Sequence, residues 1–328
     1  MTLVFVVACS SFPKALVQPP PQDYLLLKGA RQLTFEGAND SPRFSPGGDR
    51  LLFLSSQRSS HSNTQVYEFE ILRNNERRIT FQDGEIRNPS YVGDDQIMYA
   101  STTDEIKENI EPNMGAKNAA LERPPTELYQ SDLYGNEILR LTFFPGYDDE
   151  AIDVPGPRPY LLFTSFRNNL LGIYKYDLKT KSSSPLLVEK DRDKFSPTIS
   201  TDHKNLAWIE KDLEKKTYAL LISPLKSLKP RILKQDQMEW RDLHFTYDGT
   251  QLIYSAQRKN ENVFHIEIYD FEKKCTQIVF SGLDSLIQPS YSPGSPNRVI
   301  FTRVMKNTRQ IYLVDIPPDL GPCLESLH

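Results

Sequence analysis

The sequence predicts an all-β fold, a six-bladed β-propeller built from four-stranded blades. Three observations lead to it: one short motif returns at a fixed spacing, each period holds four strand-like segments, and the two ends of the chain complement each other. The motif is a short apolar run, clearest in "ARQLTFEG" and "RRITFQDG", whose central positions are Leu33, Ile79, Leu141, Leu187, Leu233 and Val279. These positions are 46 residues apart, except for one interval of 62. A propeller blade takes about 40–50 residues, and a β-sandwich has no reason to keep such a period.

Each period contains four segments in a constant order. A phrase around a proline comes first, as in "NDSPRFSPGGDR" and "IQPSYSPGSPNR". A short run of branched and aromatic residues follows, such as "RLLFLSS" or "QLIYSAQ", which is typical of a buried strand. An alternating run such as "GIYKYDL" indicates a half-exposed strand, and the "LT" run is the fourth. Turns such as "SPGGDR" and "TYDGTQ" supply glycine where a hairpin needs positive φ.

The chain ends indicate how the ring closes. The last repeat stops after its third strand, around residues 310–315, whereas the "LT" run at 31–34 precedes any strand that it could follow. Pairing the N-terminal run with the last repeat completes a sixth blade and removes a free sheet edge. We therefore expect six blades over residues 24–316, followed by a tail at 317–328.

Composition narrows the functional classes. The 328 residues carry a net charge of −4, which does not favour a nucleic-acid binder. Aromatic residues make up 11%, and 24 prolines outnumber 15 glycines, which suits many short strands and turns. No window of 18 apolar residues predicts a transmembrane helix.

The repeat phrase "LT…SPxFSPxGxxLxFxS" resembles the repeats of TolB-like propellers, which also occur in prolyl-oligopeptidase-type and tricorn-type peptidases. The resemblance covers about residues 24–316 and is weakest in the third repeat, where "DEAIDVPGPRPYLLF" lacks the Ser-Pro phrase. It implies a propeller alone, since the chain leaves no room for the α/β domain that TolB carries. TolB-like propellers engage peptidoglycan-associated proteins and peptides at the channel mouth, so the resemblance implies an envelope protein or peptide as partner.

The N-terminal sequence predicts a location in the cell envelope. "VVAC", ending at Cys9, resembles a bacterial lipobox, in which the cysteine becomes the lipidated first residue. We interpret residues 1–8 as a signal peptide, shortened because the start codon is placed too far downstream, and residues 9–23 as a proline-rich tether. Ser10 after the cysteine implies the outer membrane by the enteric sorting rule. A soluble protein with an apolar start is the alternative.

Two further cysteines, Cys275 and Cys323, are expected on the same face of the disc in neighbouring blades. An exported protein can pair them in a disulfide that pins the tail. The sequence leaves this pairing open and favours two free thiols.

No constellation of catalytic residues is evident, and we expect no cofactor. No two glycines are four residues apart, so the Gly-x-Ser-x-Gly elbow of a hydrolase is missing. The five histidines fall in different repeats and slots, without the spacing of a zinc site.

The connections between blades are rich in acidic residues. Six segments between the fourth strand of one repeat and the first of the next carry fourteen acidic and six basic side chains. In a propeller these connections share one face with the 16-residue insertion within "STTDEIKENIEPNMGAKNAALERPPTE". Such a face attracts a cation or a basic partner, although acidic residues also occur in turns for local reasons. The predicted partner-binding residues are Glu36, Asp40, Asp83, Glu85, Phe143, Tyr147, Asp148, Asp149, Glu150, Asp191, Asp193, Asp236, Glu239, Trp240, Asp242 and Asp284.

These observations predict a periplasm-facing lipoprotein, monomeric and without catalysis, that binds an envelope protein or peptide through one loop face. The alternative is a propeller enzyme, a metal-dependent hydrolase or lyase, with its site at the acidic mouth and Ca²⁺ held by the carboxylates.

Overall fold

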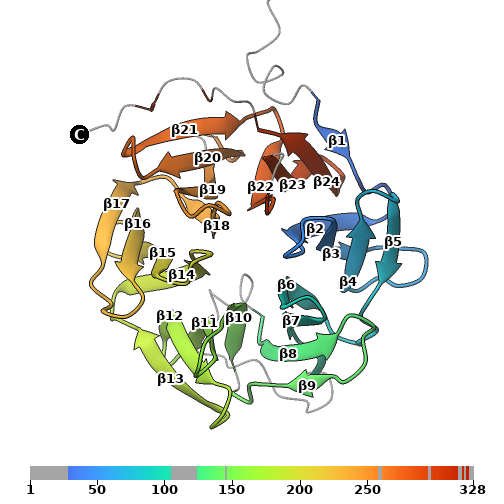
Figure 1. Ribbon diagram of the computed structural model, residues 1–328, viewed down its shortest axis with the longest axis horizontal. Helices are drawn as coiled ribbons and strands as arrows, with labels where there is room; N and C mark the ends of the chain where they lie inside the picture. Colours follow the sequence, from blue (N-terminus) through green and yellow to red (C-terminus); the bar gives the residue numbers. More distant parts are fainter. Residues whose placement is uncertain are drawn as a thin grey trace, which may run out of the picture.

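The computed structural model describes residues 29–104, 124–144, 146–257, 261–294, 297–316, 320 and 323–324. Within them, 24 strands form six four-stranded antiparallel sheets arranged around a central axis (Figure 1). The strands of blades one to three are β2 (Ala38–Phe44), β3 (Arg50–Ser56), β4 (Gln65–Glu70), β5 (Asn75–Arg78), β6 (Ile86–Val92), β7 (Gln96–Ser101), β8 (Glu127–Asp132), β9 (Leu139–Arg140), β10 (Tyr147–Val154), β11 (Tyr160–Arg167), β12 (Leu170–Asp177) and β13 (Ser182–Leu187). Those of blades four to six are β14 (Arg192–Ile199), β15 (Asn205–Asp212), β16 (Thr217–Pro224), β17 (Arg231–Asp236), β18 (Trp240–Phe245), β19 (Gln251–Gln257), β20 (Phe264–Asp270), β21 (Cys275–Phe280), β22 (Ser285–Tyr291), β23 (Arg298–Met305), β24 (Thr308–Asp315) and β1 (Arg31–Gln32).

The ring closes as the sequence predicts. Five sheets are formed by four consecutive strands, whereas the sixth has the order β1-β24-β23-β22. In that sheet Arg31 is paired with Leu313, and the Leu33 amide donates to the Ile311 carbonyl at 2.8 Å. The N-terminal strand therefore completes the last blade, and the six-bladed prediction is confirmed.

Apolar packing between blades holds the ring together. The second strand of each blade is buried on both faces, which explains why it reads as a continuous apolar run. In β3, Leu51 and Phe53 pack with blade six, while Leu52 and Leu54 pack with blade two. The same division recurs around the disc, so each blade interface has its own core cluster.

A β-bulge interrupts every innermost strand. One residue in each has positive φ, and the pairing register shifts immediately after it. We call these six residues the bulge ring: Ser41, Asn88, Glu150, Ser196, Asp242 and Gln288. In four blades a proline follows, and the Ser-Pro phrase is thus the sequence mark of the bulge, where proline is tolerated because the ladder is already broken. The third and fifth repeats keep the bulge with Ala151 and Leu243 in place of proline.

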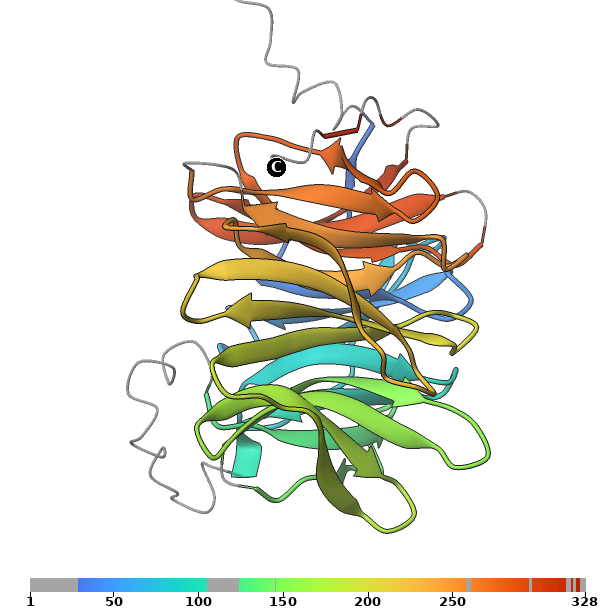
Figure 2. The same ribbon diagram turned by 90° about the vertical axis from the view of Figure 1, so that its left-hand side faces the viewer.

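Figure 2 shows the disc from its side. The inner strands run from the face with the blade-to-blade connections to the face with their own hairpin turns, which we call the connection face and the turn face. The 16-residue insertion falls largely on residues 105–123, outside the described residues, as does Cys9. Among the described residues, no helix is long and apolar enough to cross a membrane.

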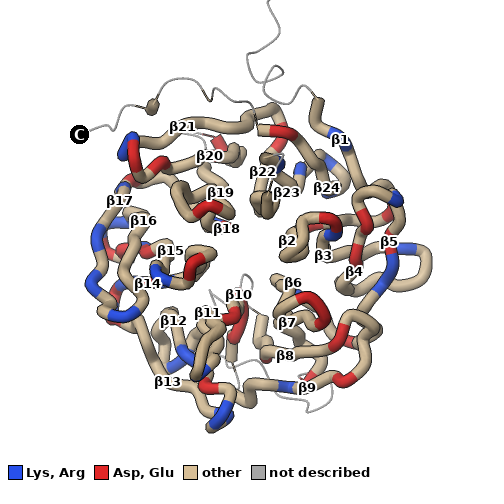
Figure 3. The backbone as a smooth tube through the Cα atoms, in the orientation of Figure 1, with Lys and Arg blue, Asp and Glu red and all other residues tan. Residues whose placement is uncertain are grey.

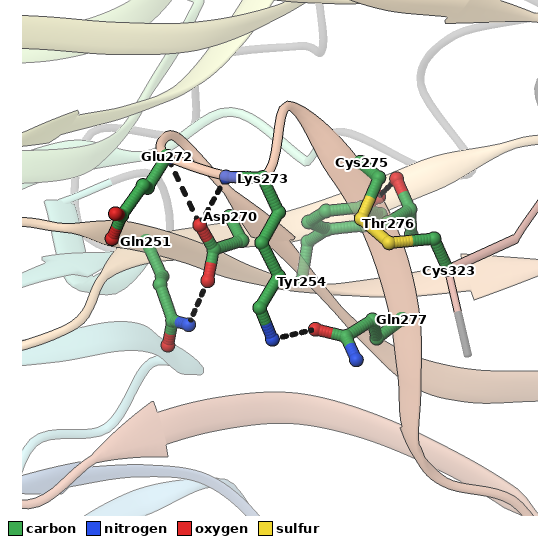
Figure 4. The surroundings of a disulfide bond; sticks show 9 residues. All are labelled: Gln251, Tyr254, Asp270, Glu272, Lys273, Cys275, Thr276, Gln277 and Cys323. Carbon is green, nitrogen blue, oxygen red and sulfur yellow. Dashed lines mark hydrogen bonds between the residues drawn. A yellow bond between two sulfur atoms is a disulfide. The ribbon is translucent and has the colours of Figure 1, made fainter. Parts of the chain in front are cut away.

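A disulfide joins Cys275 at the start of β21 to Cys323 in the tail, which corrects the preference for free thiols. Figure 4 shows the bond beside Thr276, whose carbonyl accepts the Leu324 amide at 2.7 Å. The tail therefore pairs with the outer edge of blade five. Sequence spacing left this pairing open, because Cys323 follows the last repeated segment and has no counterpart in the other repeats.

Candidate functional site

The bulge ring links neighbouring blades around the axis. The positive φ turns each backbone N–H sideways, and at three interfaces it meets a side chain of the preceding ring residue. Ser41 N donates to Gln288 Oε1 at 2.9 Å, Gln288 N to Asp242 Oδ2 at 3.0 Å, and Ser196 N to Glu150 Oε2 at 2.7 Å. Ser196 Oγ also donates to Glu150 Oε1 at 3.0 Å. These contacts make the ring a rigid belt inside the channel.

On the connection side of the ring, buried carboxylates are paired with arginines. Asp149 is fully buried and accepts from Arg87 Nε and from Asn88 Nδ2, each at 2.9 Å. Asp148, also fully buried, accepts from Arg167 Nη2 at 2.8 Å and from the Ser165 hydroxyl.

The third such pair joins blade one to blade six. Asp40 lies 2.7 Å from Arg309 Nη1. Burial raises the pKa of Asp40, and the charge of Arg309 opposes that effect. Each of these three buried aspartates on the connection side is therefore paired with an arginine of the protein.

The predicted partner-binding residues do not form one exposed surface. Glu36, Asp83, Glu85, Phe143 and Asp191 are exposed, and Asp193, Asp236, Glu239 and Asp284 are half-buried. Asp40, Tyr147, Asp148, Asp149 and Trp240 are buried. Glu150 and Asp242 are half-buried members of the bulge ring.

The expectation that these residues all lie in exposed connections is thus corrected for the buried ones. β10 begins at Tyr147 and β18 at Trp240, so residues expected in loops belong to inner strands. Several of the exposed acids also have local partners: Glu36 accepts from the Ser59 amide and hydroxyl, and Glu85 accepts from the Thr64 amide at 2.8 Å. Figure 3 shows acidic positions on inner strands such as β10 and basic positions on outer strands such as β5 and β17.

A cavity of about 560 Å³ occupies the channel on the other side of the bulge ring. We call it the axial cavity. Its inner end is formed by ring members, among them Glu150 and Asp242, and it extends to residues of the hairpin turns, Pro46, His203 and Tyr247. The space therefore lies toward the turn face, opposite to the face that the sequence indicated.

Prolines and aromatic rings make up much of the wall of the axial cavity. They come from all the blades except the third, and they are Phe44, Pro46, Pro89, Tyr91, Pro197, Phe245, Tyr247, Tyr291 and Pro293. Such surfaces pack well against apolar groups, and the volume lies in the range of small-ligand and peptide-end sites.

Arg43 and His244, which both line the cavity, have no side-chain partner among the described residues, in contrast to the arginines of the connection side. The Arg43 guanidinium makes one hydrogen bond, from Nη1 to the Pro42 carbonyl at 2.9 Å, and no carboxylate of a described residue lies within 4.0 Å of it. His244 Nε2 is buried without a hydrogen-bond partner in the described structure. Burial, with the charge of Arg43, holds the pKa of His244 well below its usual value, so its imidazole is neutral near pH 7.

Neither residue was predicted from the sequence, because both lie inside inner strands rather than in the acidic connections. Arg43 and His244 occupy the same slot, two residues after the bulge-ring member. Ser90 and Ile152 fill that slot in blades two and three and also line the cavity. A comparison of the repeats column by column would have marked Arg43 as the charged member of an inward-facing set.

Ligands for a metal ion are not gathered in the described part of the chain. No group of three or more histidine, cysteine, aspartate or glutamate side chains there is arranged to hold one. Glu150 also accepts from Thr164 Oγ1 at 2.6 Å and Asp242 from Ser255 Oγ at 2.9 Å, so both carboxylates already serve the ring.

The fold and the axial cavity place the protein in one structural class, the six-bladed β-propellers whose ring is closed and whose axis holds a cavity. No protein-family model matches the chain, and no curated protein is similar to it in sequence. Its structure is similar to TolB from Acinetobacter baumannii, at 20% identity and a TM-score of 0.63, over 79% of this chain and 58% of that one. It is also similar to putative TolB from Agrobacterium tumefaciens, at 10% identity and a TM-score of 0.56, over 86% and 91% of the two chains.

An enzyme shares the fold as well. Oligogalacturonate lyase from Vibrio parahaemolyticus matches at 12% identity and a TM-score of 0.59, over 89% of this chain and 94% of that one. At these identities the likeness shows the fold alone. The chain is thus a TolB-like propeller in architecture, and it spans little more than half the length of the Acinetobacter TolB.

Proposed function

We propose that the protein is a non-catalytic binding module of the cell envelope, which receives a segment of a partner protein in the axial cavity. The observation that carries the proposal is the cavity itself: a preformed space lined by many apolar side chains in a closed ring, with His244 Nε2 buried and without a hydrogen-bond partner among the described residues. The partner then approaches from the turn face, and the acidic connection face is a second surface available for contact.

The envelope location is supported by the likeness to TolB proteins and by the lipobox-like segment ending at Cys9. A lipid on Cys9 and a tether over residues 9–23 would leave the propeller facing the periplasm, and Ser10 favours the outer membrane.

A binding role fits the carboxylates better than catalysis does. General acid–base chemistry needs a carboxyl group free to exchange a proton with a substrate. Glu150 and Asp242 instead accept hydrogen bonds from the next blade, through Ser196 and Gln288. Both residues belong to the bulge ring and link the inner strands of neighbouring blades.

A propeller enzyme remains the second candidate, and one observation favours it. Burial, reinforced by the charge of Asp149, raises the pKa of Glu150, which is the direction expected of a general acid. Structures similar to this one include an oligogalacturonate lyase in complex with manganese. The test below therefore includes a substrate of that class.

The experiment is a pull-down from envelope extract with residues 24–328, with mass spectrometry to identify what is retained. Tyr247→Ala removes a half-exposed ring at the rim of the cavity, and Tyr134→Ala removes an exposed ring from the turn between β8 and β9. We expect one envelope protein to be retained by the wild type and by Tyr134→Ala, and to be lost from Tyr247→Ala.

Equal retention by all three would contradict a role for the axial cavity. Cleavage of oligogalacturonate by the same preparation, with or without added Mn²⁺, would favour the enzyme.

A further inference from the structure

Arg43 is the starting point because it is a cation that lines the axial cavity and forms no ion pair within 4.0 Å with a described residue. A guanidinium carries five N–H donors, and among the described residues only the Pro42 carbonyl accepts a hydrogen bond from Arg43, through Nη1. On the connection side of the bulge ring, by contrast, Arg87 binds the buried Asp149 at 2.9 Å. Arg43 therefore has donors free for a group that comes from outside.

His244 adds a second hydrogen-bonding group to the same cavity. Its Nε2 is buried and has no hydrogen-bond partner in the part of the chain that the structure describes, and the charge of Arg43 is close enough to depress the pKa of His244. A neutral imidazole can present an N–H at Nε2, which an incoming oxygen would accept. Arg43 comes from blade one and His244 from blade five, so an anion between them would be held from two sides of the channel.

The acidic members of the bulge ring lie at the same end of the cavity as Arg43 and His244, and they limit how much negative charge the cavity can accept. Glu150 and Asp242 lie at the bulge ring, and their charges act on Arg43. A dianion, or a chain of acidic sugars, would meet these carboxylates. A single carboxylate matches the one guanidinium and meets less of that repulsion than a dianion does.

We propose that the axial cavity binds the C-terminal carboxylate of a partner protein, with Arg43 gripping its two oxygens, His244 donating to one of them, and the last side chains packed against the proline and aromatic wall. A chain end fits a space whose inner end is lined by the bulge ring, whereas a loop would need room for two strands. Arginine suits a carboxylate because its planar fork matches the two oxygens. This inference rests on the proposed binding function and specifies the partner's recognised group.

The test uses a probe pair that differs only in the terminal group. N-acetyl-phenylalanyl-leucine, as free acid and as C-terminal amide, is titrated into residues 24–328 and followed by calorimetry at pH 7. We expect the acid to bind at least about tenfold more tightly than the amide, since hydrogen bonds to a charged group are the stronger ones. Arg43→Met should remove the preference, and Arg43→Lys, which keeps the charge but not the fork, should retain part of it.

Two controls keep the result interpretable. Arg73→Met removes an exposed arginine that is paired with Glu70 on the outside of blade one, and it should leave the acid preference intact. Melting curves of the Arg43 variants show whether they fold. His244→Phe should weaken the acid and spare the amide.

Equal affinity for acid and amide, or binding of neither, would overturn the inference. Tighter binding of galacturonate than of the peptide acid would show that the cavity recognises a sugar acid rather than the end of a protein chain. The two proposals fail separately: if Arg43→Met still retains the partner that Tyr247→Ala loses, the binding function stands and the carboxylate inference does not.

Discussion

The two halves of the channel are built from the same six strands, yet they treat charge differently. Between the bulge ring and the connection face, buried aspartates meet arginines, as Asp149 does Arg87. Between the ring and the turn face, Arg43 and His244 have no side-chain partners among the described residues. The first half resembles a protein interior and the second a binding site. The bulge ring thus separates polar side chains that are paired within the protein from polar side chains that are available to a ligand.

The largest effect should follow from breaking a pair in the closed half. Arg87→Met leaves Asp149 buried without its cation, and such a loss costs about 3–5 kcal/mol of unfolding free energy. Urea unfolding measures it. Arg73→Met, which breaks an exposed pair, should cost no more than about 1 kcal/mol. Similar costs for both variants would show that burial does not distinguish these ion pairs.

Glu150 lies at the boundary between the two halves, and its protonation should make the stability of the protein depend on pH. Burial, together with the charge of Asp149, raises the pKa of Glu150 in the folded state above its ordinary value of 4.5. The folded protein then binds more protons than the unfolded chain, so this group's contribution to stability falls as pH rises above 4.5. We expect Glu150→Gln to lose less stability than the wild type between pH 5 and 8, measured by urea unfolding. Parallel pH profiles would contradict the shift.

His244 should have a smaller effect of the opposite sign. Its pKa is depressed by burial and by Arg43, so below pH 6.5 the unfolded chain binds the extra proton and stability falls as pH falls. His244→Phe and His244→Gln should both flatten the profile between pH 7 and 5. A change in only one of them would point to packing rather than to the proton.

The smallest effect should be that of Arg43→Met on stability. The residue forms no ion pair within the described structure, so its loss should change the unfolding free energy by less than about 1 kcal/mol. The contrast with Arg87→Met separates a ligand-binding arginine from a structural one. A cost near that of Arg87→Met would place Arg43 in the framework of the protein.

The sequence predicted the architecture because a propeller repeats its turns, its buried second strand and its "LT" run at one spacing. The closure by residues 31–34 followed from counting strands. The acidic surface was harder, because positive φ at Glu150 and Asp242 interrupts the inner strands and makes strand residues read as loop residues. The lack of a side-chain partner for Arg43 could not be predicted from the sequence. The residues that line the cavity with Arg43 lie as far along the chain as Pro293, 250 residues away.

Closure by β1 also sets the order in which the protein can form. Blades one to five each consist of neighbouring segments, whereas the sixth needs Gln32 beside Tyr312, a separation of 280 residues. Contacts of such high sequence separation form late, because the loop entropy must be overcome first. During synthesis the ring therefore stays open until the last strand has left the ribosome. The wall of the axial cavity includes Tyr291 and Pro293 of the sixth blade, so the cavity is complete only once that blade has taken its place.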